Sequence, residues 1–257
     1  MSFLTVDDGV EIYYETTGSG PALAFAPGFM GMTKIWRDQV AELAKEYQCI
    51  AYDTRGSGRS DKPLPRVSYG VERHRDDLHA VLSSLGVKRV VVIGHSMGGN
   101  TACLYALKFP ERTAGIVLVG SYATGQNIKD AGITYDVVKN TIKTKQSRVD
   151  FYISVGIPPD IALESANWPL YAMLGNAESF LEFDVTKRLS EIKCPTLILH
   201  GDAEPVCPLD PSATYMRDNI PNAVLEVFKG VKHCSMCEDP KKFNRVLARF
   251  LKEKVTW

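Results

Sequence analysis

Short runs of apolar residues alternate along the chain with longer stretches in which apolar residues recur every three to four positions. The short runs predict strands, and the longer stretches predict helices with one apolar face. Strands are predicted at residues 3–6, 11–16, 22–26, 49–52, 90–93, 116–119, 196–199 and 224–228. Helices are predicted at residues 35–47, 71–85, 98–109, 212–219 and 240–252. Strands that alternate with helices imply right-handed crossovers, so we predict an α/β fold whose largely parallel sheet is covered on both faces.

The alternation stops after residue 121 and, after a segment that runs to about residue 188, it resumes at residues 196–199. Within this segment the sequence mixes aromatic and polar residues without a strong strand pattern, and Gly156, Pro158-Pro159 and Trp168-Pro169 act as breakers. We therefore predict one core domain made from residues 1–121 and 189–257. Residues 122–188 are predicted to form a helical cap that is inserted over the sheet.

The composition is that of an ordinary globular protein and excludes several classes of function. Thirty basic side chains balance 30 acidic ones, and no basic stripe is interleaved with aromatic residues, so we expect no nucleic acid partner. No apolar stretch approaches the roughly 20 residues that span a bilayer, and residues 1–8 lack the features of a secretory signal. We therefore expect a cytoplasmic protein without a membrane span, in which the six cysteines are reduced thiols.

The most informative motif follows the apolar run at residues 90–93. Ser96 stands in Gly94-His95-Ser96-Met97-Gly98, between a predicted strand and a predicted helix. Gly-x-Ser-x-Gly also occurs by chance in loops, but a serine on a sharp strand-to-helix turn is typical of a nucleophile elbow. The glycines leave room for a strained turn that lifts the serine hydroxyl clear of the backbone. We predict that Ser96 is a catalytic nucleophile, which requires an acid and a histidine later in the chain.

Two later strand ends supply candidates for these partners. His233 follows the predicted strand at 224–228 and is our candidate for the general base. The turn after residues 196–199 contains Asp202 and Glu204, and either carboxylate could accept a hydrogen bond from the second ring nitrogen of His233. Asp202 could instead cap its own turn. Residues 120–124, at the end of another strand, contain no carboxylate, so the acid is Glu204 or Asp202.

Two backbone N–H groups are expected to stabilise the negative charge that forms on an attacked carbonyl oxygen. One belongs to Met97, directly after the nucleophile, and the other to Phe29 in the loop at residues 27–31. Large side chains near the expected mouth predict a hydrophobic pocket, and we expect part of this set to touch the substrate. The candidates are Met30, Trp36, Trp168, Tyr171 and Met236.

The pair of cysteines in Cys234-Ser235-Met236-Cys237 has the spacing of a redox pair or of half a zinc site. No second Cys-x-x-Cys motif or histidine pair completes such a site, so we predict that no metal is bound.

Taken together, these motifs resemble the serine-nucleophile branch of the α/β-hydrolase superfamily over nearly the whole chain. The segment Tyr52-Asp53-Thr54-Arg55-Gly56-Ser57-Gly58-Arg59-Ser60-Asp61 is similar to the one after the family's fourth strand, and Phe109-Pro110-Glu111-Arg112 is similar to the end of its nucleophile helix. The resemblance implies an α/β-hydrolase fold with an eight-stranded, mostly parallel sheet and a helical cap. It also implies Glu204 as the first choice of acid, because the family's acid commonly stands three residues after the glycine of the seventh-strand turn. Two departures are Pro27, where the family usually has histidine, and Glu204, where it usually has aspartate.

Within the superfamily, the compact length and the segment at residues 53–56 are similar to oxoadipate enol-lactonases and small carboxylesterases. We predict a serine hydrolase that cleaves a carboxylic ester or lactone of a small to medium hydrophobic substrate through an acyl-enzyme. It is expected to need no cofactor and to act as a monomer or homodimer. The same residues also suit hydrolysis of a carbon–carbon bond in a β-diketone or vinylogous acid. A third alternative is a small-molecule receptor with negligible turnover.

Overall fold

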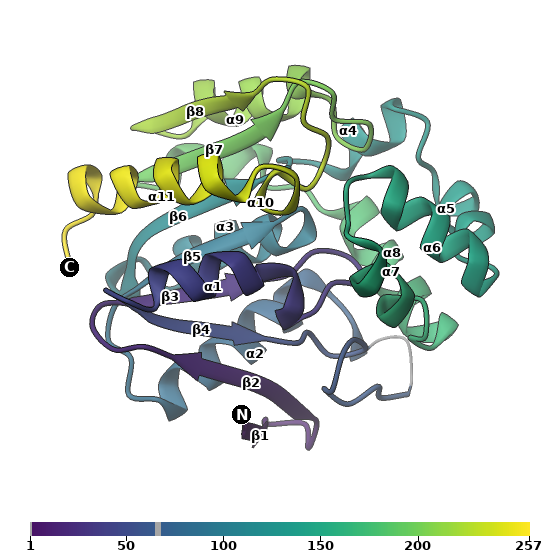
Figure 1. Ribbon diagram of the computed structural model, residues 1–257, viewed down its shortest axis with the longest axis horizontal. Coiled ribbons are helices and arrows are strands. Elements are labelled where there is room, and N and C mark those ends of the chain that lie inside the picture. Colours follow the sequence, from purple (N-terminus) through teal and green to yellow (C-terminus); the bar gives the residue numbers. More distant parts are fainter. Residues whose placement is uncertain (1, 65–67) are drawn as a thin grey trace.

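The computed structural model describes residues 2–64 and 68–257, which form the predicted α/β fold (Figure 1). Within these residues, eight strands form one sheet in the order β1-β2-β4-β3-β5-β6-β7-β8. The strands are β1 (Ser2–Thr5), β2 (Glu11–Thr17), β3 (Ala22–Ala26), β4 (Gln48–Tyr52), β5 (Val90–His95), β6 (Thr113–Val119), β7 (Thr196–Gly201) and β8 (Ala223–Phe228). The pairs β1–β2 and β2–β4 are antiparallel, and the other neighbouring pairs are parallel. The prediction of a mostly parallel eight-stranded sheet is confirmed.

Helices cover both faces of this sheet, with α1 and α11 on one face and α2 and α3 on the other (Figure 1). The helices of the core are α1 (Arg37–Leu43), α2 (Val71–Ser84), α3 (Met97–Lys108), α9 (Thr214–Asn219), α10 (Ser235–Glu238) and α11 (Pro240–Lys254). Shorter turns of helix are η1 (Thr33–Trp36), η3 (Pro110–Arg112), η4 (Thr186–Glu191) and η5 (Leu209–Ala213). Among the described residues, no helix combines the length and apolar character needed to cross a membrane.

The hydrophobic pattern explains the two most regular elements. All six residues of β5 are buried, because a central parallel strand has helices over both of its faces. In α11 the buried residues recur at helical spacing, which places one apolar stripe against the sheet. This helix begins after Asp239, whose side chain accepts a hydrogen bond from the backbone N–H of Lys242.

One predicted helix differs from the observed structure. The apolar spacing at residues 35–47 predicts a single helix, whereas the chain forms η1 and then α1, which ends at Leu43. The break falls at Trp36, which has φ −101° and ψ 9°. Trp36 is fully buried and its ring contacts those of Phe25 and Phe243, so the break coincides with a large side chain that is packed into the core.

Five helices lie between β6 and β7 and gather at the end of the sheet where the parallel strands finish (Figure 1). They are α4 (Gly125–Asp130), α5 (Tyr135–Thr141), α6 (Lys145–Ser154), α7 (Pro159–Ser165) and α8 (Leu170–Glu182). The chain enters and leaves this segment side by side, because Thr124 forms an antiparallel bridge with Asp184. The N–H of Gly125 donates to the carbonyl of Phe183 at 2.7 Å, and the N–H of Val185 donates to that of Ala123 at 2.9 Å. We call the helices α4–α8, together with the loops between them, the cap, and these paired residues its neck.

Candidate active site

Ser96 is the single residue between the end of β5 and the start of α3. Its backbone has φ 51° and ψ −120°, a conformation that is strained for any residue other than glycine. A Cβ on Gly94 would stand 2.1 Å from the carbonyl oxygen of Gly98, and a Cβ on Gly98 would stand 2.2 Å from that of Ala26. Side chains at either position would therefore collide with the helix or with β3, which is the steric reason expected for the two glycines.

Glu204 and His233 meet beyond the ends of β7 and β8. The Oε2 atom of Glu204 lies 2.6 Å from Nδ1 of His233, and both side chains are buried. Asp202 is exposed, and its Oδ1 accepts a hydrogen bond from the N–H of Gly230 at 2.6 Å. Of the two carboxylates in this turn, the structure joins Glu204 to His233, while Asp202 ties the β7 turn to the β8 turn.

The environment of Glu204 favours its ionised form. Burial acts to raise the pKa of its carboxyl, but the charge and hydrogen bond of His233 and the N–H of Val206 outweigh it, so the pKa lies below its usual range. Oε1 accepts from the backbone N–H groups of Val206 at 2.6 Å and Cys207 at 3.3 Å. These bonds leave Oε2 directed at His233. An ionised carboxylate in this position can stabilise a positive charge on the imidazole ring.

Gly120, just beyond the end of β6, lies beside both Glu204 and His233. Its φ is 50°, and a Cβ there would stand 2.8 Å from the carbonyl oxygen of His233 and 3.3 Å from Oε2 of Glu204. The backbone at the end of β6 therefore packs directly against the carboxylate and the ring. A larger residue at position 120 would separate them.

A cavity of about 240 Å³ lies next to Ser96 and His233, both of which line it. Phe29, Ile35, His95 and Cys234 belong to the core wall. The cap wall is almost entirely apolar and is formed by Ile128, Ile133, Val137, Val138, Thr141, Ile142, Phe151, Tyr152, Val155, Ile157, Ile161, Ser165 and Phe180. No Lys, Arg, Asp or Glu is among the described residues that line the cavity.

The loop that carries Phe29 lies against Ser96. A Cβ on Gly28 would stand 3.1 Å from the Cβ of Ser96, and Phe29 itself lines the cavity. Met97 begins α3 directly after Ser96, where backbone N–H groups lack partners within the helix. The structure thus brings both predicted oxyanion donors to the neighbourhood of Ser96, and their catalytic role stays a prediction.

The large residues predicted to touch the substrate are not among the described residues that line this cavity, and their role in substrate binding stays a prediction. The five are Met30, Trp36, Trp168, Tyr171 and Met236. Trp36 packs in the core between Phe25 and Phe243, and the hydroxyl of Tyr171 donates to the carbonyl of Lys62 at 2.7 Å. The Nε1–H group of Trp168 donates to the carbonyl of Met30 at 2.9 Å, and Met236 is fully buried. Large side chains bury the most apolar area, so packing of the interior uses them first.

The residues that form the cap wall were not predicted from the sequence. They are mostly isoleucine and valine, which are medium-sized and common in any interior. A usable signal was present, since Val138 and Ile142 are four residues apart and therefore share one helical face. His95 also lines the cavity, and its Nε2 lies 3.1 Å from the carbonyl oxygen of His233. Burial and the charge of His233 hold the pKa of His95 well below its usual range.

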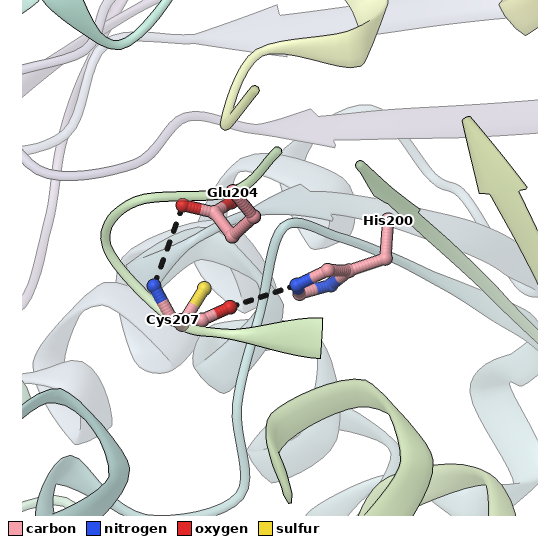
Figure 2. A group of neighbouring side chains, drawn as sticks. All are labelled: His200, Glu204 and Cys207. Atoms are coloured by element: carbon pink, nitrogen blue, oxygen red, sulfur yellow. Dashed lines mark hydrogen bonds between the residues drawn. The ribbon is translucent and has the colours of Figure 1, made fainter. Parts of the chain in front are cut away.

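Three neighbouring side chains carry atoms of the kinds that bind metal ions: His200, Glu204 and Cys207. Figure 2 shows that they are already bonded to one another through the backbone of Cys207. Its N–H donates to Glu204, and its carbonyl oxygen lies 2.8 Å from Nε2 of His200. The Cys207 thiol donates to the carbonyl of Gly120 at 3.2 Å, and burial raises its pKa well above the usual value. These contacts hold the Glu204 turn in place and keep the thiol protonated.

Comparisons with known proteins agree with this architecture. The sequence profile of the alpha/beta hydrolase fold family matches residues 21–167. The chain is 31% identical to a non-heme haloperoxidase of Rhodococcus erythropolis, with 92% of this chain and 94% of that protein aligned. It is 29% identical to 3-oxoadipate enol-lactonase 2 of Acinetobacter baylyi, over 97% and 96% of the two chains.

A solved structure gives the same result in three dimensions. An esterase from Exiguobacterium antarcticum superposes with a TM-score of 0.86 at 28% identity, over 98% of this chain and 99% of that one. The resemblance to an esterase and to an enol-lactonase therefore extends over nearly the whole length of both relatives. The chain belongs to the alpha/beta hydrolase fold family.

Proposed function

We propose that this chain is a serine hydrolase that cleaves carboxylic esters or lactones, with Ser96 as nucleophile, His233 as general base and Glu204 as the acid. One observation carries the proposal. Ser96 and His233 line a single cavity, while the carboxylate of Glu204 is hydrogen-bonded to Nδ1 of His233. That arrangement leaves Nε2 of the imidazole as the nitrogen available to the serine, as a Ser-His-acid triad requires.

The proposed reaction has two stages. His233 accepts the proton of the Ser96 hydroxyl as the oxygen attacks the carbonyl carbon, and the resulting imidazolium is stabilised by Glu204. When the tetrahedral intermediate breaks down, His233 gives that proton to the leaving alkoxide, and the acyl group stays on Ser96. Water then attacks the acyl-enzyme with His233 again as base, which releases the carboxylic acid and restores the serine.

The amides of Phe29 and Met97 are proposed to hold the oxyanion of both tetrahedral intermediates. Positioned donors act strongly here because the negative charge forms in a cavity with little water. Loss of one such donor typically costs about 2.7–4 kcal/mol of transition-state stabilisation. The predominantly apolar cap wall favours a small to medium hydrophobic substrate.

Covalent labelling tests the proposal directly. A fluorophosphonate is expected to form a single stoichiometric adduct on the peptide that contains Ser96, as determined by mass spectrometry, because the probe reports an activated serine. Product analysis on an ester and a β-diketone of matched shape then identifies the bond cleaved, and we expect the ester to react faster. An unlabelled Ser96 would support a receptor, and faster cleavage of the diketone would support carbon–carbon hydrolysis.

A further inference from the structure

The cap wall of the cavity offers almost nothing that binds a charged group. Most of its side chains are aliphatic or aromatic hydrocarbon, and the side-chain oxygens present are those of Thr141, Ser165 and Tyr152. The Tyr152 hydroxyl is already engaged, because it donates to the carbonyl of Phe29. None of the described lining residues carries a cationic ammonium or guanidinium group that could pair with a carboxylate.

We infer that this cavity takes the uncharged aliphatic acyl chain of the substrate, with room for a chain of several carbons, and that it excludes acyl chains ending in a carboxylate. The inference deepens the proposed function and rests on it. A volume of about 240 Å³ is several times the roughly 30 Å³ that one water molecule occupies in the liquid, so the cavity has room for several methylene groups. Each methylene that enters the cavity should raise kcat/KM by about fourfold until the cavity is full.

A terminal carboxylate removes this gain and adds a penalty. An anion at the cap wall loses its water without meeting a lysine or arginine side chain, and an unpaired buried charge is among the most unfavourable arrangements in a protein. A six-carbon chain is the informative length, because its end still lies within the volume of the cavity. We therefore expect p-nitrophenyl hexanoate to exceed mono-p-nitrophenyl adipate by at least about a hundredfold in kcat/KM.

A variant that fills the cavity provides the matched test of chain length. Val138 lies on α5 of the cap, apart from the elements that carry Ser96 and His233. Val138→Trp should lower the ratio of kcat/KM for the octanoyl ester to that for the acetyl ester by at least about tenfold, because the indole ring fills space that the longer chain needs. Loss of both activities with a retained fold, or a wild-type preference for the adipate ester, would overturn the inference.

Binding measurements separate this inference from the proposed function. The Ser96→Ala protein cannot form an acyl-enzyme, yet its cavity is unchanged. Hexanamide and adipic acid monoamide, titrated calorimetrically into that protein, should differ in affinity by about a hundredfold in favour of the neutral amide. If the two amides differ in affinity but the native protein does not hydrolyse esters, the proposed function is rejected and the inferred selectivity of the cavity is kept. Equal affinities would reject the inferred selectivity.

A second, independent observation concerns the loop that carries Phe29. Two cap side chains bind consecutive carbonyls of this loop: the Tyr152 hydroxyl donates to Phe29, and Nε1–H of Trp168 donates to Met30 at 2.9 Å. From the other side, the N–H of Gly31 donates to the carbonyl of Gly28 at 2.9 Å. Met30 has a φ of 58°, a conformation that persists in a non-glycine residue only where the surroundings hold it.

We propose that Tyr152 and Trp168 are positioning residues for the oxyanion site. They fix the two peptide planes that follow the Phe29 amide, so that its N–H stays aimed at the developing negative charge. A donor that is correctly placed before the reaction begins needs no reorganisation in the transition state. The cap would then contribute to the rate of the chemical step as well as to the choice of substrate.

Tyr152→Phe removes one hydroxyl and keeps the ring that lines the cavity. We expect kcat to fall by about tenfold to a hundredfold, less than for complete loss of an oxyanion donor, with KM changed by less than about threefold. Affinity for an alkylboronic acid, which mimics the tetrahedral intermediate, should fall by the same factor as kcat/KM. Tyr69→Phe is the matched control, because the Tyr69 hydroxyl also donates to a backbone carbonyl, that of Pro63, at 2.8 Å and away from the cavity.

The kinetics of these variants show whether the Tyr152 hydroxyl positions the oxyanion donor or only lines the cavity. Unchanged kcat in Tyr152→Phe, or an equal loss in Tyr69→Phe, would show that the bond does not position the oxyanion donor. A change confined to KM would show a lining role only and would also overturn the proposal. If the native protein forms no covalent adduct with the boronic acid, the proposed function itself fails.

Discussion

Replacing Ser96 with alanine is expected to lower kcat for ester hydrolysis by about a millionfold, the scale seen when the nucleophile of a serine hydrolase is removed. Alanine keeps the Cβ, so the strained turn and its packing against Gly28 are retained. We expect the variant to unfold at the temperature of the native protein within about two degrees and to take up no fluorophosphonate. Steady-state kinetics and a thermal melt check both statements.

A second buried serine provides the control for this substitution. Ser235 lies on α10, two residues after His233, and its hydroxyl has no hydrogen-bond partner among the described residues. Ser235→Ala should therefore keep kcat within about twofold. If Ser96→Ala kept more than about a hundredth of the native turnover, Ser96 would not be the nucleophile.

Replacing Glu204 with glutamine is expected to lower kcat by about ten thousandfold while the fold is kept. The glutamine carbonyl can still accept from the amides of Val206 and Cys207, so the turn keeps its hydrogen bonds. Its NH₂ group, however, would face Nδ1 of His233 as a donor. The imidazole would then hold its proton on the nitrogen that must act as base, and no carboxylate would stabilise the imidazolium.

Asp202→Asn is the matched variant in the same turn. Asparagine keeps an oxygen that can accept from the N–H of Gly230, so we expect kcat to stay within about threefold of the native value. Kinetics of the two variants, with circular dichroism to verify folding, check the assignment. A large loss in Asp202→Asn together with a small one in Glu204→Gln would reverse the roles of the two carboxylates.

Much of the fold was predictable because it follows from local patterns. Buried parallel strands have apolar residues on both faces, so runs such as residues 90–93 stand out without any knowledge of their neighbours. The turn at Ser96 was predictable for a similar reason, since Gly94 and Gly98 are needed by the backbone itself. The position of His233 beyond a strand end also follows from the order of elements.

The choice between the two carboxylates was not predictable from the residues alone. Asp202 and Glu204 are two positions apart in one irregular turn, where no periodicity fixes which side chain points inward. The decision depends on partners far along the chain: Gly230 for one and His233 for the other. The cavity lining depends on long-range packing as well, because the assembly of α4–α8 determines which of many similar aliphatic residues line the cavity beside Ser96.

The neck has a consequence for how this chain can vary. Its ends, near residues 124 and 184, are held beside each other by a bridge and two flanking hydrogen bonds, so the cap is attached to the core as a loop with closed ends. The cost of closing a loop grows only slowly with its length, so helices can be added or exchanged here without moving either anchor. We therefore expect that the cap can be exchanged as a unit. A replacement cap would have to supply side chains that donate hydrogen bonds to the carbonyls of Phe29 and Met30. Tyr152 and Trp168 make these two bonds to the loop beside Ser96.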